Sequence, residues 1–277
     1  MGLKYTWVKG LFYLLLSFVL FSGAVHAQTG LPFERDHFIS GTFQYLMPDK
    51  IGNLFALTNM GQLKKYNSSL DSMGVFNEVR RYGKLHSISA NNPLRSLLYF
   101  KEYRTIIVLD RLMQVVNKVD LRKAGIFQVQ AIAQSYDNKI WVFDEQESKI
   151  RKLDDEGKII FSTADLRLVF STPFSPTVMF DMGGYIYLYD PLQGLFIFDY
   201  YGALKNKVAL LGWKDVQTMG KQVIGFRDNQ LMIYTPGSID LQEINLPADL
   251  LQNSGIRFST SGFFVLKPEG IQRYKWR

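Results

Sequence analysis

The sequence predicts an all-β fold, a single six-bladed β-propeller of four-stranded antiparallel blades whose ring is closed by an N-terminal strand. Three observations support this prediction: a strand-like repeat of about 40 residues, a high aromatic content, and a last repeat that lacks its fourth strand. The 277 residues are 47% hydrophobic and 21% charged, as in globular proteins and unlike disordered chains. Aromatic residues make up 14% and favour strands, because flat rings pack well on a pleated sheet.

Residues 1–27 have the three parts of a secretory signal. Lys4 and Lys9 provide the positive start, residues 11–21 form an apolar run, and small side chains precede a cleavage site after Ala27. An uncleaved anchor is the alternative, but the run is short for a bilayer span of about 20 residues. We therefore expect a signal peptide at residues 1–27, a mature propeller domain at residues 28–277, and a periplasmic location.

Cysteine usage and charge narrow the function further. The absence of cysteine excludes disulfides, thiolate metal sites, a cysteine nucleophile and a lipid-bearing cysteine. Loss of Lys4 and Lys9 with the signal lowers the formal net charge from +7 to +5. This mildly basic balance permits an acidic partner surface but does not indicate nucleic acid.

Six apolar segments mark the middle of the repeats. The residues just before them are 43, 43, 46, 37 and 40 positions apart. The segments are residues 54–57, 97–100, 140–143, 186–189, 223–226 and 263–266. A second strand-like segment begins 9 to 11 residues after each of those preceding positions, so each unit contains a hairpin.

Further strands flank the hairpins. Inner strands are expected at residues 43–47, 85–89, 130–134 and 177–181, and outer strands at residues 115–119, 158–161 and 241–246. Four strands in about 40 residues are typical of a propeller blade.

The chain ends predict how the ring closes. The sixth unit stops after three strands at Arg277, while residues 36–41 are left over ahead of the first unit. We expect residues 37–40 to form the outer strand of the last blade, which also protects a sheet edge. An open two-domain sandwich is the alternative, but it does not explain so even a period.

Two segments carry a resemblance to a known group. DKIGNLFA (49–56) and DNKIWVFD (137–144) resemble the repeat of the NHL-type and TolB-like six-bladed propellers. The likeness spans about residues 43–276 and implies the fold, not a function. NNP (91–93) and GKQ (220–222) replace the expected turn residues, which leaves the boundaries of the second and fifth blades open.

No catalytic residue, cofactor or metal site is predicted. Only His37 and His86 survive signal removal, and no nucleophile elbow, phosphate loop or zinc-helix motif is present. The resemblance implies one enzymatic alternative, a calcium-dependent lactonase or esterase, which needs acidic inner strands. Asp181 is the main acid there, among Gln44, Ser87, Ser89, Gln130, Gln134 and Thr177. Strand-end Asp110, Asp144, Asp190 and Asp199 are expected to cap turns.

Sorting the loops by face gives the candidate partner-binding residues. In an antiparallel blade, the loop between the two middle strands emerges on the same face as the connector to the next blade. Cations gather in one sector of this face, with aromatic residues further round, and Arg beside aromatic anchors is typical of protein interfaces. The predicted partner-binding residues are Arg80, Arg81, Lys84, Lys101, Tyr103, Arg104, Arg122, Lys123, Phe174 and Trp213. The alternative is that the cations are ordinary solvated surface and that the rings pack inward.

The sequence thus predicts an exported, non-catalytic interaction module of the bacterial cell envelope, a scaffold that binds a protein partner. A metal-dependent hydrolase and a glycan-binding propeller remain as alternatives. Neither nucleic-acid binding nor a membrane span after signal removal is expected.

Overall fold

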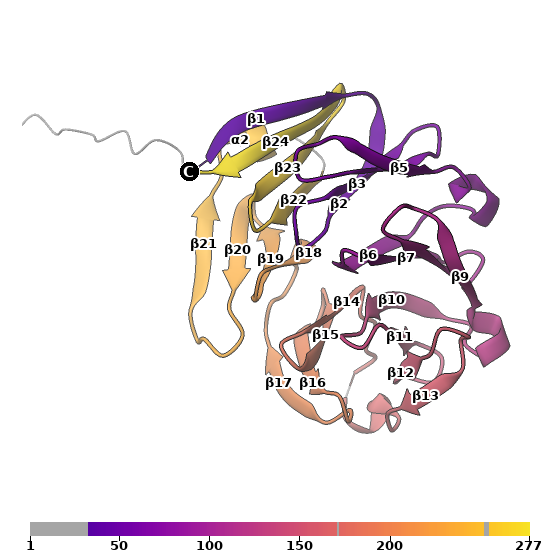
Figure 1. Ribbon diagram of the computed structural model, residues 1–277. Coiled ribbons are helices and arrows are strands. Elements are labelled where there is room, and N and C mark those ends of the chain that lie inside the picture. Colours follow the sequence, from indigo (N-terminus) through magenta and orange to yellow (C-terminus); the bar gives the residue numbers. More distant parts are fainter. Residues whose placement is uncertain (1–32, 171, 252–254) are drawn as a thin grey trace, which may run out of the picture. The chain divides into compact units, whose positions relative to one another are not determined.

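Six four-stranded antiparallel sheets are arranged as blades in a ring in the computed structural model (Figure 1). The structure describes residues 33–277 except 171 and 252–254. The predicted six-bladed propeller is confirmed, whereas the predicted signal peptide lies outside the described residues. Among those residues, no helix is long and apolar enough to cross a bilayer.

Each blade consists of an inner strand, two middle strands and an outer strand. The inner strands are β2 (Phe43–Pro48), β6 (Ser87–Asn92), β10 (Val129–Gln134), β14 (Val178–Met182), β18 (Lys214–Met219) and β22 (Ile256–Ser259). The first middle strands are β3 (Leu54–Thr58), β7 (Arg95–Phe100), β11 (Ile140–Asp144), β15 (Tyr185–Asp190), β19 (Gln222–Arg227) and β23 (Gly262–Lys267). The second are β4 (Leu63–Tyr66), β8 (Thr105–Asp110), β12 (Lys149–Leu153), β16 (Gly194–Asp199), β20 (Gln230–Tyr234) and β24 (Gly270–Trp276).

The outer strands and short helical turns complete the blades. The outer strands are β5 (Ser72–Phe76), β9 (Val115–Asp120), β13 (Ile159–Ser162), β17 (Leu204–Val208), β21 (Leu241–Asn245) and β1 (Phe33–Ser40). The helical turns are η1 (Val79–Tyr82), η2 (Leu121–Ala124), η3 (Leu166–Leu168) and α2 (Ala248–Leu251), all in connectors between blades. No bounds were predicted for the outer strands β5 and β17 or for the inner strands β18 and β22. The sequence prediction also placed β6 two residues too early, at residue 85.

The core lies between neighbouring blades. Along β7, Leu98 and Phe100 pack against the first blade, while Leu97 and Tyr99 pack against the third. Successive strand side chains point to opposite faces, and both faces of a middle strand are covered here. This explains why the middle strands read as continuous apolar runs rather than alternating ones.

The N-terminal strand closes the ring, as predicted. Figure 1 shows β1 beside β24, and the two strands pair antiparallel from Phe33 with Trp276 to Ser40 with Gly270. The strand is longer than expected, since it begins at residue 33 rather than 37.

An acidic side chain anchors this closing strand. Asp36 forms ion pairs with Arg273 and with Lys275, the latter at 3.3 Å, and contacts His37. Burial alone would raise the pKa of Asp36, but hydrogen bonds from His37, Arg273 and Lys275 outweigh it and lower the pKa to about 2. The first and last strands are thus joined by charge as well as by backbone pairing.

Aspartates at strand ends cap the turns, as predicted. Asp110 Oδ1 accepts hydrogen bonds from the backbone N–H groups of Leu112 and Gln114. Asp199 Oδ1 does the same for residues 201 and 203, Asp190 for residue 192 and Asp144 for residue 147. A short acceptor side chain bonded two residues ahead holds the backbone in the turn.

Candidate functional site: the loop face and the central cavity

The loop face is the face on which the blade connectors and the loops between middle strands emerge. Its basic sector is Arg80, Arg81, Lys84, Lys101, Arg104, Arg122 and Lys123. The loops that carry these residues are in contact. Arg104 Nε donates to the carbonyl oxygen of Phe127 at 2.7 Å, and Lys101 Nζ donates to Gln130 Oε1. Gly83 lies against Glu102 and Tyr103, so the predicted cationic residues and Tyr103 do share one region.

The basic sector carries more positive than negative charge. Glu78, Glu102 and Asp120 offset three of its seven cations, which leaves an excess of four. Arg81 pairs with Glu78 at 3.1 Å and Arg122 with Asp120 at 2.8 Å. The hydrogen bond from Arg122 lowers the pKa of Asp120.

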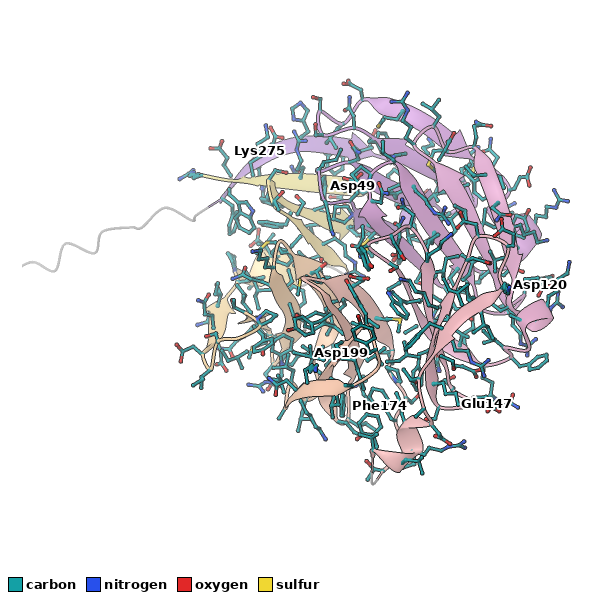
Figure 2. The ribbon with its side chains drawn as sticks, turned by 60° about the horizontal axis from the view of Figure 1, so that its bottom comes forward. Asp49, Asp120, Glu147, Phe174, Asp199 and Lys275 are labelled. Atoms are coloured by element: carbon teal, nitrogen blue, oxygen red, sulfur yellow. The ribbon has the colours of Figure 1, made fainter. Side chains whose placement is uncertain are left out.

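Five cations of the sector form no ion pair among the described residues, and two of them, Lys101 and Arg104, donate to neutral oxygens instead. Arg80, Lys84 and Lys123 are exposed, and none of them forms an ion pair with another residue in the described part of the chain. Figure 2 shows Asp120, the partner of Arg122, on the far side of the ring from Lys275 in the closing blade.

Two of the three predicted aromatic residues, Phe174 and Trp213, are buried, which corrects the sequence prediction for them, whereas Tyr103 is 51% exposed. Phe174 is 8% exposed, and its ring lies 5.4 Å from Phe143 and 4.6 Å from Phe196. Trp213 is 2% exposed and packs between the fourth and fifth blades. Connectors pass over the gaps between blades, and large rings lower the free energy most when they fill those gaps.

Two leucines on adjoining loops of this face are exposed, unlike these rings. Leu192 is 88% exposed, and Leu211 is also exposed. The backbone N–H of Gly212 donates to Pro191 O at 2.8 Å, so the loops that carry these two leucines adjoin.

A cavity of about 620 Å³ lies at the centre of the ring and is lined by all six inner strands. Each connector of the loop face leads into the first residue of an inner strand. The start of each inner strand therefore lies near the loop face, and Tyr45, His86, Gln130, Asp215 and Arg257 occupy such positions on the wall.

An ion pair marks this end of the cavity. Arg257 Nη1 lies 3.0 Å from Asp215 Oδ1; the Arg257 side chain is mostly buried, whereas that of Asp215 is 42% exposed. Asp215 has a left-handed φ of 51°, and the pairing register of β18 shifts between Lys214 and Gln217. Bulges of this kind redirect side chains. Burial raises the pKa of Tyr45 on the neighbouring inner strand β2, with the Arg257 charge acting in the other direction.

The carboxamide of Gln217, two residues after Asp215 on β18, joins two inner strands. Gln217 Nε2 donates to Ile256 O at 3.1 Å, and Gln217 Oε1 accepts from the Phe258 backbone N–H at 2.8 Å. One buried side chain thus substitutes for backbone pairing between β18 and β22.

His86 stands on the wall between the second and third blades. Its Nε2 lies 3.0 Å from the carbonyl oxygen of Gln130, which accepts, so this nitrogen carries the hydrogen. Burial lowers the pKa of His86; the Gln130 contact opposes this effect, and the charges of Lys101 and Lys84 add to it. Together these effects favour the neutral imidazole.

Asp181, the main acid expected on the inner strands, does not line the cavity. It is buried towards the opposite face, where it accepts hydrogen bonds from the Tyr136 backbone N–H at 3.1 Å, Trp141 Nε1 at 3.0 Å and the Tyr200 hydroxyl at 2.6 Å. Burial raises the pKa of Tyr200 most, and the hydrogen bond from its hydroxyl to Asp181 raises it further. Over residues 33–277 with the gaps given above, no three His, Cys, Asp or Glu side chains gather as a metal site.

Part of the cavity wall was predictable. Ser87, Ser89, Gln130 and Thr177 line it, whereas Gln44, Gln134 and Asp181 do not. Asp215 and Arg257 were missed because their strands were not recognised in the sequence.

Comparisons with known proteins support the fold alone. No family model matches the chain, and a search of curated proteins finds no match. Among solved structures, a streptogramin B lyase is similar with a TM-score of 0.56 at 13% identity, covering 84% of this chain and 78% of that one. The Pan2 WD40 domain of Neurospora crassa gives 0.58 at 11% identity, covering 88% and 95%. Virginiamycin B lyase from Staphylococcus aureus gives 0.55 at 12%, covering 83% and 79%. Propellers of this kind thus include enzymes as well as WD40 domains.

Proposed function

We propose that the chain is an exported, non-catalytic interaction module of the cell envelope whose basic sector binds an acidic surface of a partner protein. The observation that carries this proposal is the excess of four positive charges on loops that are tied together by hydrogen bonds. Export rests on the signal-like pattern of residues 1–27.

The loop contacts make the sector suitable for recognition. Arg104 and Lys101 fix the loop at residues 101–104 against the next connector. Loops that are already ordered lose less conformational entropy on binding. Exposed charges steer an oppositely charged partner and raise the association rate, an effect that salt screens.

The exposed cations without an ion pair are the residues to substitute in a test of this proposal. Reversing Arg80, Lys84 and Lys123 to Glu replaces three exposed cations that have no ion pair in the described part of the chain. Exposed charges contribute little to stability, so the variant is expected to fold. The matched control reverses Lys139, Lys158 and Lys221, three lysines in turns of the opposite face that form no ion pair among the described residues.

The assay is crosslinked capture from the native envelope, followed by affinity measurement with the captured protein. The R80E/K84E/K123E variant should bind at least about tenfold more weakly at low salt, a difference that shrinks as salt rises. The control variant should bind like the unaltered protein. Equal weakening by both variants, or an affinity that ignores salt, contradicts the basic sector as the docking surface. Intact Met1 on membrane-bound protein contradicts cleavage and export as a soluble protein.

A further inference from the structure

The wall of the central cavity is more apolar than polar. Met47 on β2, Val178 on β14, and Val216 and Met219 on β18 line it and are only half-buried, so part of each side chain remains open to the cavity. The volume of about 620 Å³ lies within the range of about 300 to 1,000 Å³ of small-molecule sites. A ligand with an apolar body would remove this surface from water, which lowers the free energy.

Several polar groups of the wall are already satisfied by the protein. Ser89 Oγ accepts from the backbone N–H of Gln134 at 3.1 Å. The carboxamide of Gln217 is used by the neighbouring strand β22, and the carboxylate of Asp49 accepts from residues 51 and 53. Groups that have partners within the protein do not require a ligand rich in hydroxyls.

Cationic groups stand at the loop-face end of the cavity. Lys101 Nζ donates to Gln130 Oε1, and Gln130 lines the cavity. The side chain of Arg257 is 16% exposed, and its Nη1 is used by Asp215 Oδ1 and by Ile256 O, both at 3.0 Å. A guanidinium carries five N–H groups, so Arg257 has further donors for an anion.

Two wall residues near these cations experience a net positive potential. Burial has the largest effect on the pKa of Tyr45 and on that of His86. The charge of Arg257 then acts on the pKa of Tyr45 more strongly than the opposing charge of Asp215. The charges that act on the pKa of His86 come from Lys101 and Lys84, and both are positive. This end of the cavity therefore favours negative charge.

The cavity has a charged end and an apolar interior along the same strands. Each inner strand runs from the loop face towards the opposite face, so on β18 Asp215 comes before Val216 and Met219. At the opposite end, the wall carries one charge of each sign, Asp49 and Lys50. The excess of positive charge is thus confined to the loop-face end.

From these observations we propose that the cavity binds an amphiphilic monoanion, whose apolar body lies inside the ring and whose single anionic head group lies at the loop-face end, beside Arg257 and Lys101. Hydrogen bonds from charged donors to an anion are stronger than those between neutral groups. A cationic head group would be repelled by the same side chains. The proposal does not depend on the protein partner of the basic sector, because it concerns the purified chain alone.

Isothermal titration calorimetry with four small molecules tests the proposal. The probe is decanoate, which joins an apolar chain to one carboxylate. The comparison compounds are 1-decanol, which lacks the charge, decylamine, which reverses it, and acetate, which lacks the chain. Decanoate should bind with one-to-one stoichiometry below its micelle concentration. Each comparison compound should bind at least about tenfold more weakly.

Two charge substitutions should change the affinity for decanoate in opposite directions. Arg257→Gln removes the cation and should weaken binding at least about tenfold. Asp215→Asn removes the opposing negative charge and should strengthen binding at least about twofold. Arg227→Gln is the control, because Arg227 pairs with Glu243 at 3.3 Å and does not line the cavity, so the affinity should not change.

A third substitution tests the place of the apolar chain. Thr218 lines the cavity, is half-buried and makes no side-chain hydrogen bond among the described residues, so Thr218→Phe should fold and obstruct the ring. This variant should lose decanoate binding, with thermal melting as the check on folding for every variant. The proposal is overturned if decanoate does not bind, if 1-decanol or decylamine binds as tightly, or if folded Thr218→Phe binds normally. It is also overturned if Asp215→Asn weakens decanoate binding.

Discussion

Replacing Asp36 by Asn tests whether charge helps to close the ring. Asp36 lies on β1 and pairs with Arg273 and Lys275 of β24, the two strands that join the ends of the propeller. Its side chain is 16% exposed, so water screens these contacts only in part. Asn keeps the size of the side chain but removes the negative charge.

The pKa of Asp36 sets the expected size of the effect. A fall from 3.8 to about 2 corresponds to about 2.4 kcal/mol, at 1.36 kcal/mol per tenfold change. Partial screening lowers this to about 1 to 2 kcal/mol of unfolding free energy at pH 7. The folded-state pKa lies below the unfolded one, so this stability is complete above about pH 4 and is lost as the pH falls towards 2.

Urea denaturation of the unaltered protein and of Asp36→Asn at pH 7, 5 and 3 measures the effect. The difference in unfolding free energy should be equal at pH 7 and 5 and about half as large at pH 3. Glu34→Gln on the same strand is the control. Glu34 pairs with Arg277 at 3.6 Å with both side chains largely exposed, so a change near zero is expected. A loss for Asp36→Asn that is the same at all three pH values would refute the reasoning, because it would come from packing and not from charge.

Two further predictions concern buried polar contacts. Tyr200→Phe removes the hydroxyl that donates to Asp181 and should lower the unfolding free energy by about 1 to 3 kcal/mol. Tyr201→Phe, at a residue that is 87% exposed, is the control and should change the unfolding free energy by less than about 0.5 kcal/mol. Equal effects of the two substitutions would show that the hydrogen bond contributes nothing. Gln217→Ala leaves Ile256 O and the Phe258 N–H without their partner and should lower the unfolding free energy, measured with urea or heat, by about 2 kcal/mol. Gln230→Ala, at an exposed contact with Asn245, is the control and should be nearly neutral. If the two variants unfold alike, Gln217 does not bridge the strands.

The ring was predictable because its signals are local. Each pair of middle strands is covered on both faces by neighbouring blades, so residues such as Leu97, Leu98 and Tyr99 form an uninterrupted apolar run. Closure followed from comparing the strands at the two chain ends, although pairing extends four residues further, to Phe33.

The site was less predictable because its signals depend on tertiary packing. Phe174 and Trp213 lie in connectors, where the sequence does not show whether a ring turns to solvent or into the gap between blades. Arg257 lies in the four-residue strand IRFS, and Asp215 lies in the mostly polar strand KDVQTM. Strands this short or polar have no clear alternating pattern, and a bulge then moves side chains off the expected face.

The topology places the two candidate sites on one face of the propeller. The connectors that carry Lys84 and Lys123 lead directly into β6 and β10, where Ser87 and Gln130 stand on the cavity wall. The two sites nevertheless use different chemistry, since exposed cations cover the loops whereas the cavity wall mixes apolar with polar side chains. Salt should therefore weaken the binding of an acidic protein to the basic sector. The affinity measurement with the captured protein, repeated at low and high salt, thus distinguishes docking on the basic sector from uncharged contacts in the cavity.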